Sequence, residues 1–133
     1  MSPGASALHG LPRSRRIKHR RDFDRARTQG KRLVQGCLVL NWFPLPPDAV
    51  SRLGVITARK LGNAVARSRA RRLLRECFRL HQQELARPIE VILVARQGIT
   101  GRKLGEVERD YLQALGKARL VKDTLAAGPS PAK

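Results

Sequence analysis

The order of apolar and polar positions along the chain predicts seven elements. Clusters of β-prone apolar residues indicate strands, and apolar residues at helical spacing indicate helices. The predicted elements are a helix over 21–29, a short edge strand over 32–34, strands over 37–43 and 52–58, a helix from 63 to about 86, a strand over 89–95 and a helix from 103 to about 121. The order α-β-β-β-α-β-α predicts an α+β sandwich, with helices packed on one mostly antiparallel sheet.

Several short segments set the boundaries of these elements. Gly30 is expected to stop the first helix, and Asn63 is expected to cap the second. The Pro-rich segment 45–51 resembles a hairpin loop between two neighbouring strands. The small, Pro- and Gly-rich ends, 1–12 and 122–133, are expected to be disordered. Residues 13–121 then form one domain.

The helix that begins at Asn63 has two chemically different sides. Its predicted apolar side comprises Ala66, Ala70, Leu73, Leu74, Cys77 and Leu80. The opposite side is predicted to carry Arg67, Arg71, Arg75 and Arg79, with Arg72 beside them and Arg69 near the boundary. A solvated helix face usually mixes charges of both signs, whereas Glu76 is the only acid in the first four turns. Each like-charge pair costs a few tenths of a kcal/mol, and bound phosphates would reverse that sign.

The net charge of +18 agrees with a polyanionic partner. Nucleic acid is the leading candidate and an anionic membrane surface is the second. The longest apolar run, 91–95, is too short to span a bilayer, and residues 1–12 lack the apolar core of a signal peptide. A cytoplasmic protein that does not use a membrane is therefore expected.

The turn before this helix adds a possible phosphate site. Arg59 and Lys60 follow a predicted strand, Gly62 permits a tight turn, and Asn63 begins the helix. Free N–H groups at a helix N-terminus beside two cations can bind phosphate.

No catalytic residue or metal site is predicted for this chain. Glu106 and Asp110 share a helix face close to Arg102 and Arg109, which favours ordinary surface ion pairs. The three histidines are expected to be unsuited to paired acid–base chemistry: His9 lies in the tail, His19 in a basic run, and His81 at the apolar edge of a helix. Cys37 and Cys77 are expected to be buried, reduced thiols.

Residues 59–76, RKLGNAVARSRARRLLRE, resemble the signature K-x-G-N-A-V-x-R-N-R-x-K-R-x-x-R-E of the bacterial ribonuclease P protein components. Further resemblance lies in RIKHRRDF (16–23), LGVITARK (53–60) and IEVILVAR (89–96), so that about 13–120 is covered. Three positions depart from the family pattern. Ser68 replaces an Asn, Arg71 stands where Lys is usual, and Arg27 replaces an aromatic residue that some relatives carry.

The resemblance implies a subunit of a ribonucleoprotein endonuclease that removes the 5′ leader from precursor tRNA. Its partners would be a catalytic RNA, which holds the Mg²⁺ ions, and precursor tRNA, with no obligate protein partner evident. The protein would lower the Mg²⁺ requirement. The implied RNA-binding residues are Arg59, Lys60, Asn63, Arg67, Ser68, Arg69, Arg71, Arg72 and Arg75. The family fold would include a left-handed βαβ crossover, against the usual handedness.

The resemblance also implies a cleft between the first helix and the sheet that holds the single-stranded leader. Phe23 and Arg16 are the candidate leader-binding residues, because bases stack on aromatic rings among cations. The alternative is that Phe23 only anchors the first helix to the sheet. Two other classes of protein remain open: a structural RNA-binding protein such as a ribosomal protein, and a DNA-binding helix-turn-helix. The second is disfavoured because the basic helix follows a strand and a Gly-Asn turn.

Overall fold

The computed structural model describes residues 13–122, and their fold is the predicted α+β sandwich. The elements are α2 (Arg20–Gln29), β1 (Lys31–Gln35), β2 (Leu38–Pro44), β3 (Arg52–Ile56), α3 (Ala64–His81), β4 (Ile89–Ala95) and α4 (Leu104–Lys117), with short 3₁₀ turns at Arg13–Arg15, Arg59–Leu61, Gln82–Glu84 and Gln97–Ile99. This order confirms the predicted succession of helices and strands. The predicted disordered tails lie outside the described residues, apart from Lys122.

The four strands form one mixed sheet in the order β1-β2-β4-β3. β2 pairs antiparallel with both β1 and β4, and β3 pairs parallel with β4. The hairpin predicted between β2 and β3 is therefore wrong, because β4 lies between them. β4 is buried along almost its whole length, because both faces of the sheet are covered at this central position.

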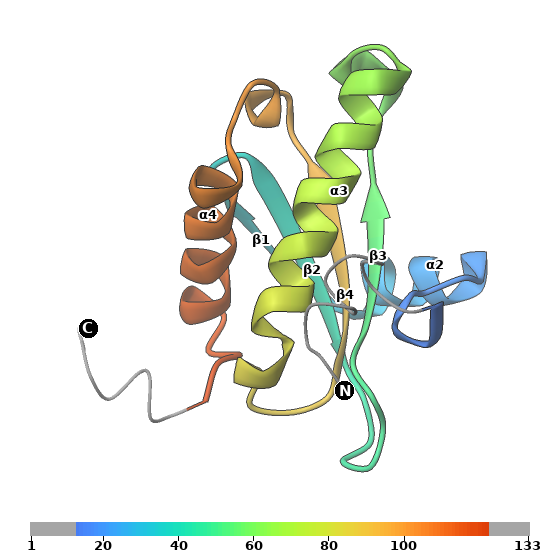
Figure 1. The fold of residues 1–133 in the computed structure, drawn as a ribbon. Coiled ribbons are helices and arrows are strands. Elements are labelled where there is room, and N and C mark those ends of the chain that lie inside the picture. The colour runs from blue at the N-terminus through green and yellow to red at the C-terminus, as the bar shows by residue number, and fades with distance from the viewer. Residues whose placement is uncertain (1–12, 123–133) are drawn as a thin grey trace, which may run out of the picture.

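The connection from β3 through α3 to β4 is a left-handed crossover. In Figure 1, β3 and β4 both point upwards, α3 runs down in front of the sheet, and β4 lies to the left of β3. A right-handed connection would place the second strand to the right. The left-handed crossover implied by the family resemblance is confirmed.

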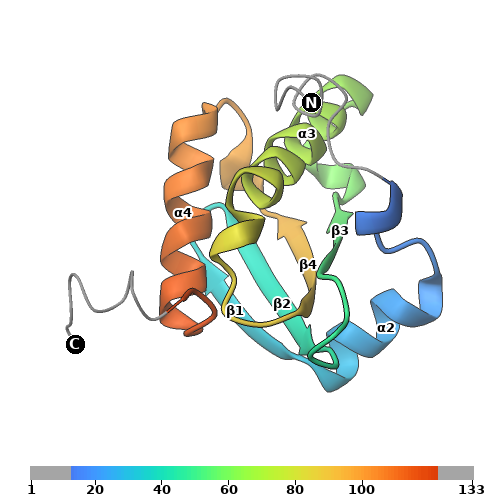
Figure 2. The same cartoon turned by 60° about the horizontal axis from the view of Figure 1, so that its bottom comes forward.

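The sheet carries helices on both faces. α3 and α4 cover one face, where the main core forms around Leu40, Leu74, Phe78, Leu93 and Tyr111. α2 lies on the other face, where a smaller cluster joins Ile17, Ala26 and Ile92. Figure 2 shows α2 on the side of the sheet away from α3. The molecule thus offers two separate surfaces, one around α3 and one around α2.

Both long helices end earlier than predicted. α3 ends at His81 and tightens into the 3₁₀ turn Gln82–Glu84, after which Leu85 is buried. α4 ends at Lys117, and Arg119 adopts the left-handed conformation (φ 58°) that commonly follows a helix. The helical spacing of apolar residues continues beyond the end of each helix. The backbone nevertheless turns there, which brings Leu85 and Leu120 into the core.

Gly30 ends α2 as predicted, although for a different reason. Its φ is −85°, which any residue can adopt. A Cβ atom there would come within 2.2 Å of the Trp42 carbonyl oxygen and 2.3 Å of the Ala26 carbonyl oxygen. Glycine is needed because the helix end lies directly against β2.

Candidate nucleic-acid interface

The N-terminus of α3 has the predicted turn and cap. Gly62 has φ 147°, in the region that favours glycine, and the Asn63 side-chain oxygen accepts a hydrogen bond from the Ala66 N–H at 2.9 Å. The 3₁₀ turn before it exposes Arg59 and Lys60. Among the described residues, no acceptor is present for the N–H groups of Ala64 and Val65. This end of α3 therefore combines free donors with cations.

The arginines in the first half of α3 are held by neutral oxygen atoms. Arg67 donates to the Gly62 carbonyl at 3.0 Å. Arg71 donates to Thr57 Oγ1 at 2.8 Å and to Ser68 Oγ at 3.1 Å. Arg69 donates to the Arg102 carbonyl at 2.7 Å. These bonds orient the guanidinium groups without neutralising them, and Ser68 serves as an acceptor for one of them.

The predicted arginine stripe lies on a flank of α3 rather than opposite its buried side. Arg71 and Arg75 are only half-exposed, and the bond from Arg71 to Thr57 directs this flank towards the end of β3. Burial lowers the pKa of Arg75, and the nearby cations Arg16 and Arg71 lower it further. The flank therefore gathers cations from α3 and from the segment before α2.

One further detail of the predicted α3 faces is wrong. Leu80, placed on the apolar side, is exposed, whereas Phe78 is fully buried. Arg79 differs from the other arginines of the stripe, because it forms two hydrogen bonds with Glu76, at 2.9 and 2.5 Å. The hydrogen bond from Arg79 also holds the pKa of Glu76 below its usual value. The charge of Arg79 is thus balanced by a carboxylate.

Acidic side chains are concentrated away from the first half of α3. In the part of the chain that the structure describes, the ion pairs involve α2, β3, β4, the C-terminal part of α3 with the turn after it, and Glu108 of α4. We call the following residues the basic cluster: Arg59, Lys60, Arg67, Arg69, Arg71, Arg72 and Arg75. Among residues 13–122, no carboxylate lies within 4.0 Å of the charged nitrogens of this cluster. Seven cations thus share one end of the molecule, and none of them has a carboxylate partner within residues 13–122.

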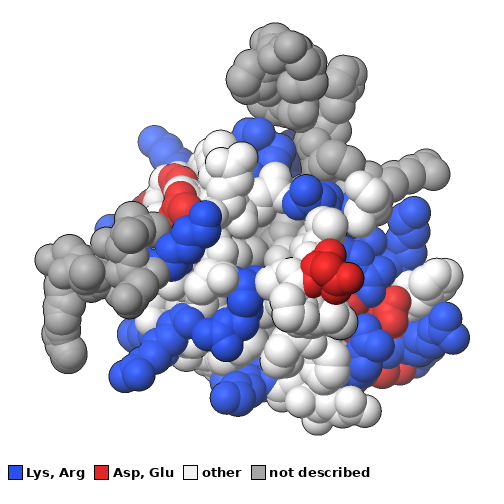
Figure 3. Space-filling view, turned by 90° about the horizontal axis from the view of Figure 1, so that it is seen from below, with Lys and Arg blue, Asp and Glu red and all other residues white. Residues whose placement is uncertain are grey.

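Figure 3 shows the opposite end of the molecule, seen from below. There, acidic groups lie among the lysines and arginines, separated by stretches of uncharged surface. The two ends therefore differ in charge balance, and the end that carries the N-terminus of α3 is the better surface for a polyanion.

A groove of about 420 Å³ lies on the face of the sheet that carries α2. Its lining residues are Asp24, Arg27, Thr28, Arg32, Val39, Asn41 and Val94. Asn41, which is nearly buried, places an amide in its floor. Arg27, Arg32 and Asn41 were not among the residues predicted to bind a ligand. A signal was available for Asn41, which is the polar residue within an otherwise apolar strand.

The two predicted leader-binding residues do not line this groove. Phe23 is half-buried and packs against the small cluster of Ile17, Ala26 and Ile92. Arg16 forms an isolated parallel bridge with Leu53 of β3. Both therefore lie on the β3 side of α2, whereas the groove extends towards β1 and β2. The structure does not bring Phe23 and Arg16 together with the groove.

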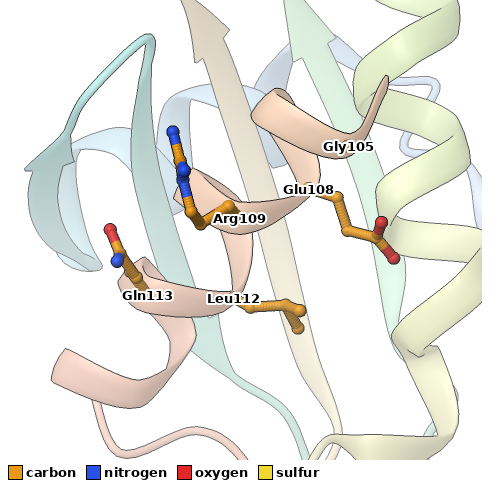
Figure 4. Close-up of a pocket in the computed structure, with 5 residues that line it drawn as sticks. All are labelled: Gly105, Glu108, Arg109, Leu112 and Gln113. Atoms are coloured by element: carbon orange, nitrogen blue, oxygen red, sulfur yellow. The ribbon is translucent and has the colours of Figure 1, made fainter. Parts of the chain in front are cut away.

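A shallow depression of about 390 Å³ lies on α4, lined by Gly105, Glu108, Arg109, Leu112 and Gln113. Figure 4 shows Glu108 and Leu112 directed towards α3, whereas Arg109 and Gln113 point to the other side. Glu108 already contacts His81, with its Oε2 atom 2.5 Å from His81 Nε2. Arg109 is the one cation among the residues that line this depression, so it lacks the group of cations found at the α3 end.

His81, which the sequence places at the apolar edge of a helix, joins two helices through polar contacts. Its Nδ1 atom lies 2.6 Å from Glu84 Oε2, and its Nε2 atom contacts Glu108 of α4. Burial lowers the pKa of His81, but the hydrogen bonds to both carboxylates outweigh burial and raise the pKa above its usual value. His81 therefore acts as a clamp between the end of α3 and α4.

The structure corrects the interpretation of Asp110 and confirms that of the cysteines. Asp110 is buried and accepts the Cys37 backbone N–H at 3.0 Å, so it is not part of a surface ion pair. Cys37 and Cys77 are free, buried thiols, as predicted. Burial raises the pKa of each to about 12, which makes both thiols inert.

Residues 13–122 contain no group of three His, Cys, Asp or Glu side chains arranged to hold a metal ion. No helix in this part of the chain is long and apolar enough to cross a membrane.

This chain is similar in sequence to proteins of a known family. The family described as Ribonuclease P matches residues 11–119. The ribonuclease P protein component of Desulfovibrio desulfuricans is 36% identical over 104 residues, which are 76% of this chain and 75% of that protein. The chain belongs to the family of ribonuclease P protein components, the protein subunits of an endoribonuclease complex that processes the 5′ end of tRNA.

Solved structures agree with this assignment. The Staphylococcus aureus RNase P protein superimposes with a TM-score of 0.73 at 27% identity, covering 81% of this chain and 98% of that one. A mutant of the same protein, described as defective in mRNA degradation activity, gives a TM-score of 0.75 at 26% identity, covering 88% and 96%. The α+β fold with a four-stranded mixed sheet is therefore the fold of this family.

Proposed function

We propose that the basic cluster docks the protein onto the catalytic RNA subunit of ribonuclease P, together with Asn63 and Ser68. The observation that carries this proposal is the absence of carboxylates within 4.0 Å of the cluster's cations, among the described residues. Cations held at one end by neutral acceptors repel one another until a polyanion is bound. Arginine is suited to this contact because its planar guanidinium can bind a phosphate through two hydrogen bonds.

We also propose that the α2 face of the sheet binds the single-stranded 5′ leader of precursor tRNA. The groove lined by Arg27, Arg32 and Asn41 offers cations for the backbone and an amide for a base edge. Phe23 and Arg16 would contact the leader where it passes α2 on the β3 side. Asp24 at the rim carries a negative charge, so the leader would pass beside it rather than over it.

The catalytic Mg²⁺ ions would be held mainly by the RNA subunit. The protein's part is to supply fixed cations where RNA subunit and leader approach each other, which replaces some of the counterions that Mg²⁺ would otherwise supply. The Mg²⁺ concentration needed for cleavage should therefore fall when the protein binds. The proposed place of action is the cytoplasm, and no further protein partner is required.

A matched pair of charge variants tests the docking surface. The test variant replaces Arg67, Arg69 and Arg72 with Gln. The control replaces Arg87, Lys117 and Lys122 with Gln, which removes the same three charges from exposed positions at the other end of the molecule. The test variant should bind the RNA subunit with a salt dependence that is smaller by roughly 2–3 in slope, because each phosphate that the protein no longer neutralises lowers the slope by about 0.7–0.9. Equal slopes for the two variants would contradict the proposal.

A further inference from the structure

The loop between β4 and α4, residues 96–103, carries three cations and no acidic residue. Arg96 and Lys103 are exposed and Arg102 is half-exposed. Among residues 13–122, no carboxylate lies within 4.0 Å of their charged groups. Glu106 accepts the backbone N–H of Lys103 at 3.0 Å, a contact that does not involve the ammonium group. The loop therefore shares the unbalanced positive charge of the basic cluster.

The backbone of this loop is firmly held. Ile99 is buried and anchors the loop in the core. The Arg96 N–H donates to the Cys37 carbonyl at 3.0 Å, and the Arg102 N–H donates to the Ile99 carbonyl at 3.0 Å. Two guanidinium groups are also oriented, since Arg96 donates to the Gly36 carbonyl and Arg102 to the Gly98 carbonyl. Cations fixed in this way lose less conformational freedom when they bind a ligand.

The loop is joined to the basic cluster by two hydrogen bonds. Arg69 of α3 donates to the Arg102 carbonyl at 2.7 Å. The Gln97 side chain donates a long hydrogen bond, 3.5 Å, to the Lys60 carbonyl, so these two segments lie next to each other. In Figure 1 the loop lies at the upper end of the molecule, next to the upper half of α3. The two sets of cations thus form one surface.

We infer that residues 96–103 form a second contact with the RNA subunit, in which Arg96, Arg102 and Lys103 bind phosphates of the folded RNA. This inference rests on the proposed docking of α3 onto that RNA. The leader is a poorer candidate, because its proposed groove lies on the α2 face of the sheet. A protein partner is also disfavoured, since no large apolar side chain in the loop is exposed.

Charge variants in the loop give the first test. Arg96, Arg102 and Lys103 are replaced together with Gln, which leaves the Arg102 carbonyl in place as the acceptor for Arg69. The control is again Arg87, Lys117 and Lys122 replaced with Gln. Affinity for the catalytic RNA is measured across a range of KCl concentrations, and thermal unfolding shows whether each variant folds. The loop variant should lower the slope of log affinity against log salt by roughly 2–3, whereas the control should not. A loop variant that folds and keeps the wild-type slope would overturn the inference.

Crosslinking gives a second test that needs no change in charge. Thr100 in the loop and Gln83 after α3 are both exposed, and each is replaced singly with Cys. Because both native thiols are buried, an aryl azide that carries a phenacyl bromide can be attached to the new thiol, which displaces the bromide. The probe at position 100 should crosslink to the RNA subunit, and the probe at position 83 should not. If the wild-type protein binds RNA with a steep salt slope but position 100 gives no crosslink, only the loop contact fails. If the wild-type protein shows no salt-dependent binding, the proposed function itself fails.

Discussion

The ring of Phe23 in α2 lies directly against the backbone of Gly54 in β3. A Cβ atom at Gly54 would come within 2.5 Å of the ring Cε1 atom and 2.7 Å of Cζ. The backbone of Gly54 is therefore the surface on which α2 rests, and Phe23 sets the distance between this helix and the sheet.

Replacing Gly54 with Ala should displace Phe23 and destabilise the protein. Overpacking of this kind typically costs about 1–3 kcal/mol in the free energy of unfolding, measured here by urea denaturation. The cost should be smaller when Phe23 is already Ala, because the clash is then absent. Additive effects of Gly54→Ala and Phe23→Ala would show that the two residues do not interact.

Phe23→Ala separates the two roles considered for this side chain. If Phe23 contacts the leader, binding of precursor tRNA should weaken by about 1–3 kcal/mol and binding of mature tRNA should be unchanged. The half-buried position and the contact with Gly54 also predict a loss of stability. Phe23→Leu is the matched control, since it keeps much of the packing and removes the aromatic face. Equal losses for precursor and mature tRNA with both variants would leave Phe23 as an anchor only.

Glu90 of β4 should be indispensable to the position of α2. Its carboxylate is fully buried and contacts Arg25 of α2 at 2.9 Å and Arg52 of β3, so Glu90→Gln would leave two guanidinium groups without their buried partner. Removing one member of a fully buried ion pair typically costs about 3–5 kcal/mol. Because the Arg25 and Arg52 side chains are 38% and 29% exposed, urea denaturation should show a loss at or below the lower end of that range. Arg52→Gln should cost less, because Arg25 still contacts Glu90. A loss below about 1 kcal/mol for Glu90→Gln would contradict this role.

The His81 clamp should make stability depend on pH. The pKa of His81 is raised in the folded protein, so its contribution is fully present below the unfolded-state pKa of about 6.5 and is lost as the pH rises through the folded-state pKa. The difference in unfolding free energy between the wild type and His81→Gln should therefore be larger below that unfolded-state pKa than in alkaline buffer. A difference that is constant or grows with pH would show that the clamp does not depend on the charge of His81.

Local sequence signals predicted the parts of the candidate site that depend on neighbouring residues. The Asn63 cap, the turn at Gly62 and the clustering of arginines on α3 all follow from positions within a few residues of each other. The pair between Glu76 and Arg79 has a helical spacing of three, so it could also have been predicted.

Features that depend on distant segments could not be predicted in the same way. The place of β4 between β2 and β3 is set by burial of both its faces, which no local pattern in β2 or β3 reveals. The burial of Asp110 depends on the Cys37 N–H, 73 residues away in the chain. The bond from Arg69 to the β4–α4 loop is likewise non-local, so the sequence did not connect that loop to the basic cluster.

The central claim is that this chain binds RNA and leaves the cleavage of precursor tRNA to the RNA subunit. The most direct test is a cleavage assay at low Mg²⁺ with RNA subunit alone, protein alone and both together, using protein shown to be free of RNA. Cleavage at the 5′ end of the tRNA should require both components, and higher Mg²⁺ should restore activity to the RNA subunit alone. Replacing Arg67, Arg69 and Arg72 with Ala should raise the Mg²⁺ concentration that the two together require. Correct 5′ cleavage of precursor tRNA by the RNA-free protein would contradict the claim.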